Sequence, residues 1–214
     1  PTKIFEALVG EMRTGTVWIN IAVSLQRVLI GFAMAAVVGI VLGVLLGWFN
    51  VISDYLSPII HSIRPIPPIA WTPLAILWFG IGNGPGYFLV FMGAVFPIFI
   101  NTYVAVRNVD KSHINAALSL GASNRMVTME VLVPSAIPII FTGLRIGLGM
   151  GWTCVVAAEL IAADSGLGYS IQLNRVLLRT ENVIVGMVVI GVLGLLFDAL
   201  MARIERQVAP WRTA

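Results

Sequence analysis

Long apolar runs, separated by short charged stretches, dominate the chain. Val28–Phe49 and Pro65–Val106 contain no charged residue, while Ser135–Leu160 contains Arg145 and Glu159, and Val183–Met201 contains Asp198. A bilayer core about 30 Å thick is crossed by roughly 20 helical residues. These runs therefore predict membrane-spanning helices.

Pro65–Val106 is long enough for two spans, because it would measure about 63 Å as one helix. We predict a hairpin here, with its turn at Gly80–Gly86, where glycine and proline disfavour a helix. Together with Val28–Phe49, Ser135–Leu160 and Val183–Met201, this gives five spans.

Two segments outside the spans also show helical patterns. Phe5, Leu8, Val9 and Met12 recur at i, i+3, i+4 and i+7, which predicts an amphipathic helix too polar to span. Asp164–Glu181 is expected to be a loop containing one short helix.

Four prolines, Pro65, Pro67, Pro68 and Pro73, fall where a span should begin. Proline lacks a backbone donor and obstructs the preceding turn, so the span is expected to be broken or to start late. Broken backbone at membrane depth often marks a transport pathway. The alternative is that the prolines merely end a short cytoplasmic helix over Ser53–Arg64.

Small residues recur at every fourth position in two spans. The first stripe is Gly31, Ala35, Gly39, Gly43 and Gly47, and the second is Gly143, Gly147 and Gly151. Such faces allow close helix contact. Packing within one subunit is favoured over a dimer interface.

Composition supports a membrane class and excludes several chemistries. Hydrophobic residues make up 58% and charged residues 11% of 214 residues, against about 25% charged in soluble domains. Neither Lys3 nor Lys111 follows a glycine, so no phosphate loop is present, and we expect no nucleotide hydrolysis by this chain. A lone Cys154 and two distant histidines give no metal motif. Scattered basic residues form no stripe for nucleic acid.

Basic residues favour one orientation of the five spans. One side has seven lysine and arginine residues, the first set, and the other side has five, the second set. The excess on the first side places the C-terminus and Arg107–Glu130 in the cytoplasm. Because the chain begins with Pro1, we expect it to be an N-terminally incomplete copy, with any leading helix before Pro1. The first set is Arg64, Arg107, Lys111, Arg125, Arg203, Arg206 and Arg212, and the second is Lys3, Arg13, Arg27, Arg175 and Arg179.

The segment from Ser112 to Pro134 predicts a bent two-helix knob on the cytoplasmic face. Ala117 and Leu118 share a shallow apolar face with Ile114 and Gly121, and Gly121 can adopt the left-handed conformation that ends a helix. Ser123 is placed to cap the next helix. Small residues suit insertion into a partner's groove. An ordinary amphipathic connector is the alternative.

This segment resembles the cytoplasmic signature of ABC importer permeases, E-A-A, three residues, G, nine residues, I-x-L-P. Ala116, Ala117, Gly121 and Pro134 match it, Val131 and Val133 are conservative departures, and Asn115 replaces the glutamate. The resemblance implies that the following residues couple the chain to an ATPase: Asn115, Ala116, Ala117, Leu118, Ser119, Leu120, Gly121, Ala122 and Ser123.

Two further stretches, Arg64–Gly82 and Ala157–Ile161 followed by Gly166–Gly168, resemble the nitrate, sulfonate and taurine branch of these permeases. They are more similar to alkanesulfonate and taurine permeases than to nitrate or bicarbonate ones. The resemblance therefore implies import of a small anion, with a taurine-like sulfonate favoured and nitrate or bicarbonate as the alternative.

The resemblance also implies an all-α, type I-like, six-helix permease in a bacterial inner membrane, of which five helices are visible. Residues 1–214 would form a single permease domain with 107–134 as its coupling segment. The expected partners are a second copy, two cytoplasmic ATPase subunits that bind ATP and Mg, and an extracytoplasmic binding protein. The chain itself would be no enzyme and would hold no cofactor.

Residues at the proline-rich break and the charges inside the fourth span are candidates for the translocation path, because intramembrane charge usually faces a wet cavity or the bundle interior. For Arg145 the alternative is a structural bond to helix-end carbonyls or to Asp198. The candidates are Pro67, Pro68, Trp71, Thr72, Arg145 and Glu159.

Two other classes of protein remain as alternatives. An intramembrane protease needs paired aspartates or a G-x-S-x-G serine with a histidine, yet Asp198 has no second aspartate at comparable depth and neither histidine lies in a span. A channel or secondary transporter working alone would be supported by inverted repeats, and no convincing repeat relates the two halves.

Overall fold

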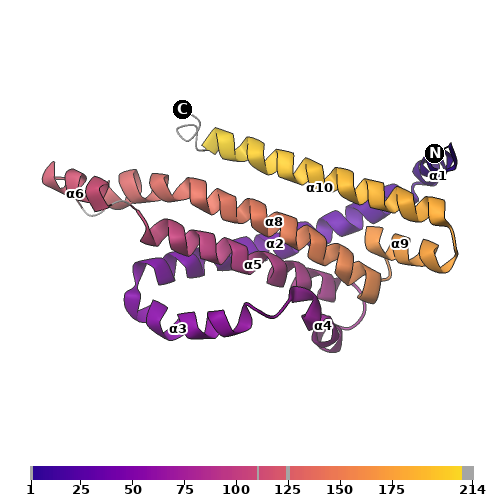
Figure 1. Ribbon diagram of the computed structural model, residues 1–214, viewed down its shortest axis with the longest axis horizontal. Coiled ribbons are helices and arrows are strands. Elements are labelled where there is room, and N and C mark those ends of the chain that lie inside the picture. The colour runs from indigo at the N-terminus through magenta and orange to yellow at the C-terminus, as the bar shows by residue number, and fades with distance from the viewer. Residues whose placement is uncertain (1, 110, 124–125, 209–214) are drawn as a thin grey trace.

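The computed structural model describes residues 2–109, 111–123 and 126–208, and its secondary structure there is helical. Four helical runs are long and apolar enough to cross a membrane: α2 (Thr16–Trp48), α5 (Asn83–Arg107), Glu130–Ala162, which contains α8 (Val133–Ala162), and α10 (Thr180–Val208). They extend along the long axis of the molecule (Figure 1). The predicted all-α membrane fold is confirmed.

The first long helix starts well before the predicted boundary at Val28. α2 begins at Thr16 and includes Arg27, which is 1% exposed. The predicted boundary at Val28 is wrong because Arg27 lies inside the helix, although a lone basic residue in a span is costly. In the structure an acidic partner within the bundle neutralises it, so the helix continues through Arg27.

The proline-rich region forms two short helices instead of one uninterrupted span. α3 (Asn50–Ile63) ends before the prolines, a 3₁₀ turn η1 (Pro68–Trp71) follows, and α4 (Thr72–Phe79) rises only about 12 Å. Pro67 is extended, with φ −57° and ψ 135°, and interrupts the helix. α3 and α4 succeed one another back along the bundle (Figure 1), so a broken passage takes the place of the first span of the predicted Pro65–Val106 hairpin, as the prolines predicted.

The predicted turn at Gly80–Gly86 is shorter than expected. Gly80 and Gly82 take positive φ values of 73° and 130°, and α5 already begins at Asn83. Pro85 lies in the first turn of α5, where its missing N–H would have had no helical partner.

The short helices lie at the two ends of the bundle. α1 (Thr2–Thr14) and α9 (Leu167–Val176) lie near one end, and α6 (Lys111–Ser119) protrudes from the other (Figure 1). α1 buries none of its residues, and α9 is the short helix predicted within Asp164–Glu181. Two basic residues used for orientation, Arg125 and Arg212, are outside the described part of the chain.

Helix α5 is clasped between α2 and α8, and the two glycine stripes make the contacts. A Cβ added to Gly43 would lie 2.5 Å from Cβ of Thr102, and one added to Gly147 would lie 2.8 Å from Cγ1 of Ile98. Backbones can approach this closely only where side chains are absent. The prediction that these stripes pack within one subunit is confirmed.

Candidate functional site

A buried polar cluster ties α2, α5 and α8 together at the end of the bundle that carries α9. Nη1 of Arg27 donates to Oε1 of Glu159 at 2.9 Å, and its Nη2 donates to Oδ1 of Asn83 at 2.7 Å. Nη1 also donates to the carbonyl oxygen of Ser165 at 2.6 Å. The Arg27 cluster, as we name it, consists of Ser24, Arg27, Asn83, Glu159, Ser165 and Gly168.

The carboxylate of Glu159 is fully satisfied within this cluster. Oγ of Ser24 donates to Oε1 at 2.8 Å, and the backbone N–H of Gly168 donates to Oε2 at 2.9 Å. The Glu159 side chain is 0% exposed. Several charge-assisted bonds offset the cost of burying the ion pair. In this conformation Glu159 therefore holds elements together and faces no open cavity.

The glycines that follow Glu159 in sequence are explained by this carboxylate. A Cβ on Gly166 would lie 2.4 Å from Cδ of Glu159, and one on Gly168 would lie 2.6 Å from the carbonyl oxygen of Val156. Gly166 also has a φ of 111°, which disfavours other residues. The Gly166–Gly168 motif is thus where the end of the loop and the first turn of α9 close over Glu159.

Arg145 belongs to a different site on α8, about 21 Å along the helix from Glu159. Its Nε and Nη2 donate to Oδ1 and Oδ2 of Asp198 at 2.5 and 2.7 Å. The two side chains are 40% and 56% exposed. This geometry supports the structural alternative named for Arg145, pairing with Asp198, and its place on a path stays a prediction.

The remaining path candidates lie at the break between α3 and α4. Pro67 is exposed, Pro68 and Trp71 are half-buried, and Thr72 is buried, with its hydroxyl donating to the carbonyl oxygen of Ile69 at 2.6 Å. Within the described residues, Nε1 of Trp71 is buried and has no hydrogen-bond partner. The six candidates thus fall into three groups: this break, the Arg27 cluster and the Arg145–Asp198 pair.

The bend predicted between Ser119 and Ser123 is present. Gly121 has a φ of 86°, and the N–H of Ala122 donates to the carbonyl oxygen of Ala117 at 3.0 Å, which closes α6. Oγ of Ser123 accepts the N–H of Met126 at 3.3 Å, as a capping side chain does. A π-helical turn, η2 (Val127–Leu132), then leads into α8.

The knob protrudes with most of its side chains in solvent. Leu118 is 44% and Leu120 is 89% exposed, while Ala117 is half-buried. Ala116, Ala117, Glu130 and Pro134 line a groove of about 500 Å³ between α6 and the start of α8. The knob thus presents two exposed leucines next to this groove.

A bundle of long apolar helices with a protruding knob at one end and a buried ionic cluster at the other is the architecture of a multi-pass integral membrane protein. The chain belongs to the family of binding-protein-dependent transport system inner membrane components, whose profile matches residues 28–210. It is therefore an inner-membrane permease subunit of an ABC importer, as the sequence predicted.

Relatives in this family include permeases with different named substrates. The chain is 42% identical to a putative ABC transporter permease of Methanocaldococcus jannaschii, over 95% of this chain and 76% of the relative. It is 39% identical to the taurine transport system permease TauC of Escherichia coli, over 92% of this chain and 71% of that relative. It is also 39% identical to the nitrate import permease NrtB of Synechocystis, over 90% of this chain and 70% of that relative.

Two solved structures share the fold. An inward-facing MetNI methionine ABC transporter superposes with a TM-score of 0.71 at 23% identity, covering 91% of this chain and 95% of that one. An amino acid ABC transporter superposes with a TM-score of 0.71 at 19% identity, covering 94% and 97%.

Sequence reasoning singled out Glu159 but missed its partners Ser24, Arg27 and Asn83. A usable signal was present, because an acidic residue deep in a span needs a cation or several donors nearby. The orientation count places Arg27 among the basic residues outside the spans, so that count does not identify it as the cation.

Proposed function

We propose that this permease imports a small sulfonate of the taurine class, and that two copies of the chain form the pathway. The Arg64–Gly82 and Ala157–Gly168 stretches, which resemble sulfonate and taurine permeases, support this substrate class. The relative named for nitrate has the same identity as the one named for taurine. Nitrate is therefore the second candidate.

The observation that carries the proposed coupling is the knob. Its bend is fixed by Gly121 and Ser123, its leucines are exposed, and it protrudes beyond the long helices (Figure 1). We propose that residues 115–123 dock into each of two cytoplasmic ATPase subunits, which bind ATP and Mg and perform the hydrolysis. An extracytoplasmic binding protein would deliver the substrate to the opposite end.

Uptake into vesicles that contain the chain, its ATPase and its binding protein tests the substrate. Labelled taurine and labelled nitrate are supplied in parallel, with ATP inside the vesicles. We expect ATP-dependent taurine uptake. Nitrate uptake without taurine uptake would contradict the sulfonate proposal and support the second candidate.

Two variants of the knob test the coupling. Ala117→Asp would bury an unpaired charge at the docking surface, at a cost of several kcal/mol if fully buried, and Gly121→Val would oppose the left-handed bend. Both should reach the membrane in normal amount but lose ATPase binding and uptake. Gln207→Asp, an exposed position near the end of α10, serves as control. Full uptake by Ala117→Asp would exclude the knob as the docking element.

A further inference from the structure

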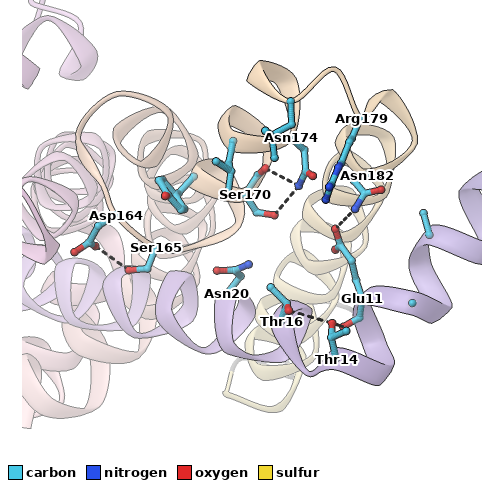
Figure 2. A pocket seen from close by; sticks show the side chains of 15 residues that line it. Glu11, Thr14, Thr16, Asn20, Asp164, Ser165, Ser170, Asn174, Arg179 and Asn182 are labelled. Atoms are coloured by element: carbon cyan, nitrogen blue, oxygen red, sulfur yellow. Dashed lines mark hydrogen bonds between the residues drawn. The ribbon is translucent and has the colours of Figure 1, made fainter.

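Side-chain hydrogen bonds tie short helices to long ones at both ends of the molecule. At the end that carries α9, Nδ2 of Asn182 in α10 donates to Oε1 of Glu11 in α1 at 2.7 Å (Figure 2). At the other end, the hydroxyl oxygens of Ser53 in α3 and Tyr103 in α5 lie 3.5 Å apart. This second bond joins the start of the broken passage to the helix that precedes the proposed coupling segment.

Helix α3 is anchored to the bundle near its start. Among the side chains of α3 that the structure describes, Ser53 alone is fully buried, at 3% exposed. Val51, Tyr55 and Ile59 are each more than half exposed. The backbone is extended at Phe49, with φ −106° and ψ 103°, so α3 leaves α2 at a break in the helix. Ser53 is therefore the point at which the rest of α3 is held to the bundle.

Tyr103 belongs to the tightly packed part of the bundle. Its ring stacks on that of Phe99, with centroids 6.1 Å apart and planes at 26°. A Cβ added to Gly47 of α2 would lie 2.8 Å from Cβ of Val106 and 3.3 Å from the carbonyl oxygen of Tyr103. The backbones of α2 and α5 are thus in close contact at this level. A bond from Ser53 to this phenol therefore fixes α3 relative to α2 and α5.

The hydroxyl of Tyr103 is also bonded on the side of the coupling segment. Nη1 of Arg107, the last residue of α5, donates to it, and the guanidinium carbon lies 5.5 Å from the centroid of the ring. Because Arg107 donates to the phenol oxygen, the hydroxyl hydrogen is left for Oγ of Ser53. The hydroxyl oxygen of Ser57, one turn further along α3, lies 3.2 Å from that of Ser53. A series of hydrogen bonds thus runs from the end of α5 into α3.

The same end of α5 is connected to the knob by a short stretch of chain. Three residues of sequence separate Arg107 from Lys111, where α6 begins. Such a connection spans at most about 14 Å when fully extended. α6 contains the first of the residues proposed to dock into the ATPase and protrudes beyond α5 (Figure 1). A larger displacement of α6 must therefore move the end of α5 as well.

We propose that Tyr103 is a positioning residue for transport, whose hydroxyl holds α3, and with it the proline-rich break, to the end of α5 that the ATPases displace. The inference rests on the proposed coupling through residues 115–123, and it adds the route by which that movement reaches the broken passage. With the bond made, α3 follows α5. Without it, α3 turns about Phe49 independently, so ATP is hydrolysed without a matching movement of the passage.

The test uses vesicles that contain the permease, its ATPase and its binding protein, and measures ATP hydrolysis together with uptake of taurine and of nitrate. Tyr103→Phe keeps the ring beside Phe99 and Arg107 but removes the hydroxyl. The ATPase should still bind and hydrolyse ATP at a normal rate, while uptake per ATP hydrolysed falls about two- to tenfold, as loss of one hydrogen bond implies. Ser53→Ala should give a similar fall, and the double variant should fall no further, because both changes break the same bond.

Two controls separate coupling from stability. Tyr55→Phe removes a hydroxyl from a tyrosine of α3 that is 78% exposed, and Asn182→Ala breaks the bond between α10 and α1 at the opposite end. Both should leave uptake per ATP hydrolysed unchanged. An unchanged ratio in Tyr103→Phe, even with less assembled complex, would overturn the positioning role, and so would an equal fall in either control. Failure of the proposed coupling is recognised separately, as full uptake by Ala117→Asp.

Discussion

The Arg27 guanidinium and the Glu159 carboxylate meet at 2.9 Å between α2 and α8, with side chains 1% and 0% exposed. Removal of one partner leaves a buried charge uncompensated, which typically costs about 3–5 kcal/mol. We therefore expect Arg27→Met and Glu159→Met each to lower the Tm of the solubilised permease strongly. Thermal unfolding followed by size-exclusion chromatography measures this, with the exposed Arg175→Met as control.

The double variant Arg27→Met/Glu159→Met distinguishes a pair from two separate contributions. Because both charges are then absent, its Tm should lie above that of either single variant. If the decrease in Tm of the double variant equals the sum of the decreases in the two single variants, the two side chains stabilise the protein independently.

Gly166 offers a steric test of the same cluster. Gly166→Ala would place a Cβ 2.4 Å from the Glu159 carboxylate at a φ of 111°, so we expect a lower Tm and less assembled complex. Gly149→Ala is the matched control, because a Cβ there meets nothing within 4 Å and alanine favours a helix. Equal Tm values for the two variants would contradict the close contact.

The Arg145–Asp198 pair is expected to serve assembly more than transport. Arg145→Gln should lower the amount of assembled complex, because Asp198 loses a bidentate partner, while uptake per assembled complex is unchanged. Exchange of the two charges, Arg145→Asp with Asp198→Arg, should restore part of the assembly. Lower uptake per complex, with assembly intact, would instead place Arg145 on the pathway.

The indole N–H of Trp71, which has no hydrogen-bond partner among the residues that the structure describes, provides a test of the broken passage. A buried donor without an acceptor costs about 1–3 kcal/mol, so Trp71→Phe should not lower the Tm, provided that the ring contact with Phe88 is kept. If the N–H serves a passing substrate, uptake should fall several-fold. Trp78→Phe, which removes an indole from another contact with Phe88, is the control. Equal uptake by both variants would remove Trp71 from the path.

Topology can be checked with single cysteines after Cys154→Ala. We expect cysteines at Thr14 and Gln207 to react with an impermeant reagent from opposite sides, because five passages separate them. Thr14 should label from outside, as the basic-residue count implies. Labelling of both positions from one side would mean that α3 and α4 do not together cross the membrane.

The sequence was sufficient for features that depend on local pattern. The apolar runs predicted α5, α8 and α10, the glycine stripes predicted close packing, and Gly121 with Ser123 predicted the bend. Each of these follows from neighbouring residues on one helix. Long-range pairing was not accessible in this way, because Arg27 and Asn83 meet Glu159 only after the helices pack.

The start of α2 shows why such pairing matters for boundaries. The sequence predicts a span that starts after Arg27, because a basic residue in a membrane is costly when alone. Once Glu159 and Asn83 surround it, that cost is offset and the helix extends back to Thr16. The break at the prolines was predicted, but its division into η1 and α4 was not, because no local rule states where a helix resumes after several prolines.

The two glycine stripes that pack against α5 separate a tightly packed group of helices from the more loosely packed remainder of the molecule. With almost no side chain between their backbones, α2, α5 and α8 cannot slide past one another without collision. α10 buries only Val185 and Gly186 among its residues, and none of the residues of η1 is buried. We therefore expect α2, α5 and α8 to move as one rigid body during each transport cycle. Bending is expected at the proline-rich break, and sliding is expected of α10.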